Sequence, residues 1–339
     1  HAMNKEEELQ RNLFSFIKGK LAPSESLVEE ISEVLCVSTD SAYRRIRGEK
    51  FLSLPELIIL CGKYNIPVDE LVSVTNSNNI SFTTRFITQQ DISFEIFLED
   101  IRKELELYCN GRNSRLTFIL NELNLLQLIQ IPELACFKFF FWKKSSLGLD
   151  DMENREFSFD FLTDQSKDII REIVRFYVKI ESNEMISGEV LNSFLKQVKY
   201  YHDAGFFSSK SDPILLINKL ELLVNHLYRQ ASLGYKFPFG HVEEGQAKNL
   251  HLYHNDIILV DNLILANYDE NEVSFITNNT INLLKSNNTE YFRYNNLLAE
   301  NLIRRSVLIS GTGERMRNKI FLSLKNKIKE TLDYIESSP

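Results

Sequence analysis

The chain has 339 residues, of which 43% are hydrophobic and 25% charged, and its formal net charge is −8. These proportions are ordinary for a globular protein, and the length predicts two or three domains. An acidic chain is not expected to coat nucleic acid non-specifically, although the net charge says little about a small basic patch. The most apolar short run, Phe137 to Trp142, is far below the roughly 20 residues that span a bilayer.

The cysteines indicate a reducing compartment. Cys36, Cys61, Cys109 and Cys136 lie far apart in the chain and form no C-x-x-C pair. This pattern is too sparse for a disulfide framework or a zinc site. We therefore expect reduced thiols in a cytoplasmic protein without a signal peptide.

The first part of the chain has the pattern of a small helical domain. Leu9, Leu13, Phe16 and Ile17 form one apolar face, and Ser26 to Glu29 has the spacing of a capping box that begins a second helix. Gly48 ends the third helix, and Pro55 opens the fourth. The sequence predicts helices over about residues 4–20, 27–35, 38–47, 54–64 and 68–72. We expect this domain over residues 4–74 and a polar linker over 75–84.

Residues 85–339 are expected to form a larger, predominantly helical α+β domain for effector binding and dimerisation. The alternative is a subdivision into a helical part, 85–240, and an α+β part, 250–339. Apolar periodicity predicts helices over residues 91–109, 132–144, 165–180, 188–201, 213–232, 289–304 and 313–335. The segment 116–131 fits a strand or a helix. Short β-rich runs at 256–260, 263–268 and 272–277, separated by turn residues, predict a small antiparallel sheet.

The N-terminal segment resembles the Cro/phage-repressor helix-turn-helix family, also called the xenobiotic-response-element type. The resemblance covers about residues 4–74. The matching parts are Val37-Ser38-Thr39, Tyr43-Arg44-Arg45-Ile46-Arg47-Gly48, the leucines Leu54, Leu57 and Leu60, and Asn65 to Leu71. It implies a five-helix, lambda-repressor-like fold. The family usually has Gly where this chain has Cys36, because that turn residue prefers a positive φ, which costs other residues about 1 kcal/mol.

Physical reasoning on the same residues agrees with the resemblance. Ile31, Val34, Leu35, Val37, Ala42 and Ile46 are spaced to pack two short helices together. The leading end and outer face of the third helix then stay free to meet base edges in a major groove. Residues 1–74 contain nine basic and twelve acidic residues, yet four of the nine basic residues fall within Arg44 to Lys50. Such a local cluster matters more than the domain sum, because phosphate contacts are short-range.

The resemblance also implies roles for individual residues. Thr39, Asp40 and Arg44 match base-reading positions, and Tyr43, beside them on the same outer face, is assigned to base reading with them. Ser38, Arg45, Arg47 and Lys50 are assigned to the DNA backbone. A homodimer is expected, because one short helix reads only a half-site.

Other motifs give weaker signals. His241, Glu243, Glu244, His251 and His254 cluster in sequence, but the surrounding glycines favour a loop over a metal site. Gly311-Thr312-Gly313 lacks a following Lys-Ser or Lys-Thr, so no nucleotide fold is supported. The aromatic run Phe137 to Trp142 fits a core better than a ligand pocket. No catalytic set stands out, and we expect neither an enzyme nor a cofactor.

The sequence therefore predicts a sequence-specific transcriptional regulator that binds double-stranded DNA. Its second domain would respond to an unidentified small-molecule or peptide effector, without contacting a membrane. The alternative is an interaction protein, such as an antitoxin or phage-immunity component, whose N-terminal unit docks a protein instead of DNA.

Overall fold

In this computed structural model the chain forms two compact units, residues 1–82 and 83–339. The boundary falls within the range expected for the linker. The structure describes residues 5–21, 25–64, 66, 68, 71, 80–84, 93–241, 248–257, 262–278 and 282–337. No described helix is both long and apolar enough to cross a bilayer.

The N-terminal unit packs short helices around one small core. Its described helices are α1 (Lys5–Lys20), α2 (Leu27–Val34), α3 (Thr39–Ile46) and α4 (Leu54–Lys63). Leu13 and Ile17 of α1, Ile31 of α2, Ala42 of α3 and Leu60 of α4 are fully buried in this core. The helix predicted over 68–72 lies largely outside the described residues, so the five-helix fold stays a prediction.

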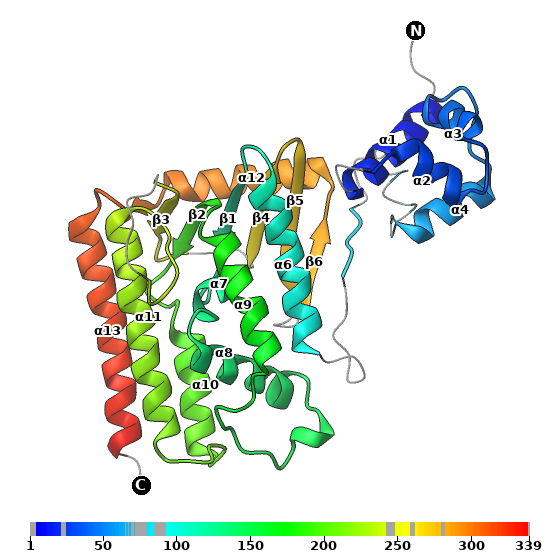
Figure 1. Cartoon of the computed structure of the whole chain (residues 1–339). Helices are drawn as coiled ribbons and strands as arrows, with labels where there is room; N and C mark the ends of the chain where they lie inside the picture. The colour runs from blue at the N-terminus through cyan, green and yellow to red at the C-terminus, as the bar shows by residue number, and fades with distance from the viewer. Residues whose placement is uncertain are drawn as a thin grey trace. The chain divides into compact units, whose positions relative to one another are not determined.

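The second unit is built on a mixed seven-stranded sheet in the order β6-β5-β4-β1-β2-β3-β7 (Figure 1). Its strands are β1 (Arg115–Ile119), β2 (Glu181–Ile186), β3 (Leu250–His254), β4 (Leu263–Tyr268), β5 (Asn271–Asn278), β6 (Asn282–Ser286) and β7 (Val307–Leu308). Its helices are α6 (Phe94–Asn110), α7 (Leu125–Leu128), α8 (Pro132–Phe141), α9 (Asp164–Tyr177), α10 (Asn192–Asp203), α11 (Asp212–Leu233), α12 (Thr289–Arg304) and α13 (Glu314–Ser337). A π-helical turn, Trp142–Ser146, continues α8, and a 3-10 turn covers Asp150–Met152.

The prediction of a small antiparallel sheet was wrong. β1 pairs with β2 in parallel, and β2 pairs with β3 in parallel, so these three neighbouring strands run in one direction. The predicted strands at 263–268 and 272–277 are present as β4 and β5. The strand predicted at 256–260 is not seen at residues 256–257, and its remainder lies outside the described residues. Residues 250–254 form the strand instead. The predicted antiparallel strands form one side of a larger sheet, and β7 pairs antiparallel with β3 at the opposite edge. The parallel strands between them are joined by long helical connections.

Helices cover the two faces of the sheet unequally. Ile119, Met185 and Leu265 pack on one face with Phe292 and Ala299 of α12. The opposite face carries the main core, which includes residues of α6, α8, α9, α11 and α13. In Figure 1 these helices stand before the strands, and α12 runs along the other side. Because successive strand residues point to opposite faces, Ser182, Glu184 and Ile186 of β2 share the face under the larger helical layer.

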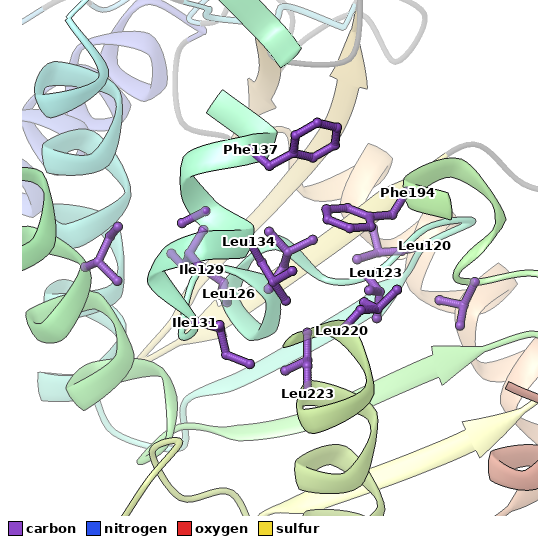
Figure 2. Packing of buried hydrophobic residues seen from close by; sticks show 14 of the residues in the cluster. Leu120, Leu123, Leu126, Ile129, Ile131, Leu134, Phe137, Phe194, Leu220 and Leu223 are labelled. Atoms are coloured by element: carbon purple, nitrogen blue, oxygen red, sulfur yellow. The ribbon is translucent and has the colours of Figure 1, made fainter. Parts of the chain in front are cut away.

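The aromatic run of α8 belongs to the core, as the sequence favoured. The Phe137 ring centroid lies 5.4 Å from that of Phe157, 5.5 Å from that of Phe194 and 5.4 Å from that of Tyr201. These contacts are edge-to-face, a preferred aromatic geometry. Figure 2 shows side chains from α8, α10 and α11 meeting in the same region, with Phe137, Phe194 and Leu220 among them.

A tight turn before α13 requires glycine. A Cβ on Gly313 would lie 2.2 Å from the carbonyl oxygen of Leu308 and 2.8 Å from Cα of Ile309. The buried Arg317 closes the same turn, because its guanidinium donates to the carbonyl of Ile309 at 2.9 Å and to that of Gly311 at 3.1 Å. The Gly-Thr-Gly motif therefore has a packing role at the start of this helix.

We expect Gly313→Ala to lower the free energy of unfolding of the second unit by about 2 kcal/mol, because backbone atoms must move to admit the methyl group. Gly188→Ala is the matched control, since a Cβ there meets its nearest atom, Asp256 Oδ1, at 3.8 Å. Urea denaturation followed by the fluorescence of Trp142 measures both. Equal midpoints for the two variants would contradict the steric argument.

Candidate nucleic-acid interface

The turn between α2 and α3 has the positive φ that the family resemblance predicts for its turn residue. Cys36 has a φ of +50°, so this chain places a non-glycine residue in the left-handed region. The Val37 amide donates to the carbonyl of Ser32 at 3.0 Å, and the Ser32 hydroxyl donates to the carbonyl of Val37 at 2.6 Å. These two bonds hold the turn that positions the start of α3.

The N-termini of α2 and α3 differ in whether a serine side chain caps the helix. Ser38 caps α3, because its hydroxyl oxygen accepts a hydrogen bond from the Ser41 amide at 3.3 Å. Ser26 precedes α2 in an extended conformation, but its side chain makes no capping bond. The predicted capping box at Ser26 is therefore not formed.

The four residues assigned to base reading share an exposed surface on α3. Thr39, Asp40, Tyr43 and Arg44 are all exposed. Tyr43 is 47% exposed, and the Arg44 side chain is 54% exposed. The fully buried Ala42 faces away from them into the core. The outer face of α3 is thus free within its own unit, as a groove-binding helix requires.

Arg47 and Lys50 extend this surface beyond the end of α3. Both are exposed, and the Arg47 guanidinium lies 5.4 Å from the centroid of the Tyr43 ring. Glu49 lies between the cations, at 3.9 Å from Arg44 and 3.4 Å from Arg47. Exposed pairs of this kind are worth about 0–1 kcal/mol and are screened by salt, so phosphate groups can displace Glu49.

Arg45 does not belong to this surface, contrary to its assignment to the DNA backbone. It is 3% exposed, and its guanidinium contacts the Glu56 carboxylate of α4 at 2.6 Å. The same guanidinium donates to the Ser41 carbonyl at 3.0 Å. The cause is helical periodicity: Arg45 lies three residues after Ala42 and so shares its inward face. Arg45 ties α3 to α4.

The partner carboxylate is held in its charged form. Burial alone would raise the pKa of Glu56, but the hydrogen bond from Arg45 and that from the Ser53 amide at 2.9 Å outweigh it and lower the pKa below its usual value. Glu56 is charged and accepts hydrogen bonds from both Arg45 and Ser53. Its pairing with Arg45 is therefore a strong, charge-assisted hydrogen bond that joins α3 to α4.

Sequence reasoning missed Gln10, which fixes the far end of α3. Its amide nitrogen donates to the carbonyls of Arg45 at 2.6 Å and Lys50 at 2.9 Å. Its amide oxygen accepts from the Leu52 amide at 2.8 Å. This one side chain of α1, 6% exposed, therefore holds both the helix end and the loop that carries Arg47. The sequence feature that could have identified Gln10 is its position as a polar residue beside Leu9 and Leu13 on the otherwise apolar face of α1.

The histidine cluster does not assemble. His251 and His254 lie three residues apart on β3, so they point to opposite faces of the sheet. His251 contacts Glu181 at 3.0 Å, whereas His254 contacts Asp256 at 3.1 Å. No group of three or more metal-binding side chains occurs among the described residues. His241 is exposed, and Glu243 and Glu244 lie outside the described residues.

Comparison with known proteins adds no further assignment. No protein-family model, no curated protein and no solved structure matches the chain.

We expect Arg45→Met to destabilise the N-terminal unit by about 3 kcal/mol, because it leaves the Glu56 carboxylate without its buried partner. Arg44→Met is the matched control, and as a surface substitution it should change stability by less than about 0.5 kcal/mol. Hydrogen exchange at the Ala42 amide, which donates to the Ser38 carbonyl at 2.9 Å, reports on α3 directly. Similar protection in both variants would show that the pair does not anchor α3.

Proposed function

We propose that the chain is a sequence-specific DNA-binding transcriptional regulator. The N-terminal unit would place α3 in the major groove, and residues 85–339 would dimerise the protein and respond to an effector. The observation that carries the proposal is the exposed outer face of α3, which joins base-reading side chains to adjacent cations. The structural anchors of the helix, Arg45 and Gln10, leave that face free.

The chemistry of the face suits DNA. An exposed arginine can make a bidentate contact to guanine, and Thr, Asp and Tyr side chains offer shorter polar contacts to neighbouring base edges. We assign base reading to Thr39, Asp40, Tyr43 and Arg44. Ser38, Arg47 and Lys50 are assigned to the backbone, and Arg45 is removed from that set. A dimer would present two such helices to a two-fold symmetric site.

One observation favours the alternative of protein docking. Leu54 and Ile58, one turn apart on α4, are 68% and 57% exposed, and Phe51 before the helix is 48% exposed. Apolar side chains gathered on one small unit are typical of protein contacts. The same residues would also serve a dimer of a DNA-binding protein, so binding to duplex DNA is the property that separates the two functions.

Substitutions on α3 test the proposal. We expect Arg44→Ala to weaken binding to a selected duplex about tenfold or more while changing random-duplex binding less, because a base contact is lost. Arg47→Ala should weaken both by a similar factor and lower the salt slope by about one, because a phosphate contact is lost. Fluorescence anisotropy over a range of salt concentrations measures these effects.

Lys18→Ala is the control, since it removes the same charge from the exposed end of α1, outside the α3 surface. It should leave both affinities nearly unchanged. Equal losses for Arg44→Ala on selected and random duplexes would contradict its base-reading role. If the wild-type chain binds no duplex at low salt, the DNA-binding proposal fails and protein docking replaces it.

A further inference from the structure

Glu49 lies in the turn that follows α3, and its backbone is fixed on both sides. Gly48 has a φ of +79°, and its amide donates to the Arg45 carbonyl at 3.0 Å. The Glu49 amide donates to the Arg44 carbonyl at 2.9 Å. These two bonds form a Schellman motif, which commonly ends a helix at a glycine. The carbonyl of the residue after Glu49 accepts from the Gln10 amide at 2.9 Å, so the turn holds its acidic side chain at a defined place.

The Glu49 carboxylate lies between two cations of the α3 surface. Its Oε1 lies 3.4 Å from Nη1 of Arg47, and its Oε2 lies 3.9 Å from Nε of Arg44. The Arg47 guanidinium also lies over the Tyr43 ring, so a carboxylate and an aromatic face hold it together. The side chains of Arg44 and Arg47 are nevertheless 54% and 59% exposed. A phosphate group can therefore reach both guanidinium groups from the solvent.

The Glu49 contacts differ from the buried arginine–glutamate pair of the same unit. Arg45 and Glu56 are almost enclosed, and their ion pair joins α3 to α4. Glu49 pairs only with exposed side chains of the α3 surface and joins no helix to another. Removing its charge should therefore leave the fold intact, because surface substitutions of this kind rarely change stability. The position of Glu49 calls for a role in binding instead.

Glu49 and a DNA phosphate compete for the same donors, because both are oxyanions that accept hydrogen bonds from a guanidinium group. When the α3 surface meets a duplex, Arg47 exchanges the carboxylate for a phosphate. The carboxylate is then left beside the anionic backbone, well within the screening length of about 8 Å. The lost ion pairs and the new repulsion both weaken binding. Since the phosphates carry no sequence information, random and selected duplexes suffer the same loss.

We propose that Glu49 is an intramolecular competitor of DNA phosphate. It holds Arg47, and more weakly Arg44, in the free protein, and so lowers the affinity of the α3 surface for every duplex. A random duplex offers phosphate contacts alone, and the competition keeps such binding weak. A selected duplex also offers base contacts, which outweigh the loss of two exposed ion pairs. The inference rests on the proposed DNA-binding function and adds the residue that limits its strength.

Glu49→Gln tests the proposal on the full chain, because it removes the charge and keeps the shape of the side chain. We expect binding to random and to selected duplexes to tighten by a similar factor, about three- to tenfold at low salt, as two exposed ion pairs are lost. The salt slope should steepen by about one, since the surface gains one net positive charge. Fluorescence anisotropy with both duplexes measures the two effects, and the affinities of the variant and the wild type should converge at high salt.

Two further variants separate competition for Arg47 from a general change in net charge. In the Arg47→Ala background, the gain from Glu49→Gln should fall to about twofold or less, because the main partner of the carboxylate is absent. Glu29→Gln is the matched control: it removes the same charge from an exposed position of α2, and among the described residues its carboxylate pairs with neither arginine. It should change both affinities less than about twofold.

The proposal is overturned if Glu49→Gln binds no tighter than the wild type, if Glu29→Gln tightens binding as much, or if the gain persists undiminished without Arg47. Urea midpoints equal to that of the wild type show that the variants are folded, and Glu49→Ala replaces Glu49→Gln if the latter does not fold. A wild-type chain that binds neither duplex at low salt refutes the DNA-binding function and this inference together. A wild-type chain that binds, with no gain on removing the Glu49 charge, refutes the inference alone.

Discussion

The N-terminal unit depends on how an eight-residue helix is held. A helix as short as α3 is not stable in isolation, so its position must come from contacts with its neighbours. Ala42 packs it into the core, Arg45 binds it to Glu56 on α4, and Gln10 of α1 holds its end. Because Ala42 and Arg45 lie on the inner side of the helix and Gln10 binds at its end, the outer side stays exposed. The surface that we assign to DNA exists as a consequence of these anchors.

The elements that sequence reasoning predicted well are those specified by local patterns. The helix over 289–304 and the strand over 263–268 have the predicted bounds, because apolar periodicity and flanking turn residues define both. The positive φ at Cys36 was expected from the resemblance instead, because the turn residue at that position is usually Gly. Arg45 was misplaced for a different reason. Its charge suggested a phosphate contact, whereas its spacing from Ala42 already indicated the inward face.

What the sequence concealed depends on contacts between distant residues. β2 begins Glu-Ser-Asn-Glu, which does not resemble a buried strand, yet Ser182 and Glu184 are buried because residues as distant as Gln127 and Lys236 complete their network. The parallel pairing of β1 with β2 joins segments more than sixty residues apart, which periodicity does not report.

The central claim is that the exposed face of α3 reads DNA sequence. Selection of bound duplexes from a random pool by the full chain tests it most directly, because the selected sites report both sequence preference and half-site spacing. The account predicts a short two-fold symmetric site whose halves are centred about one helical turn, or a multiple of it, apart. Recovery of no preferred sequence under low-salt conditions would contradict it.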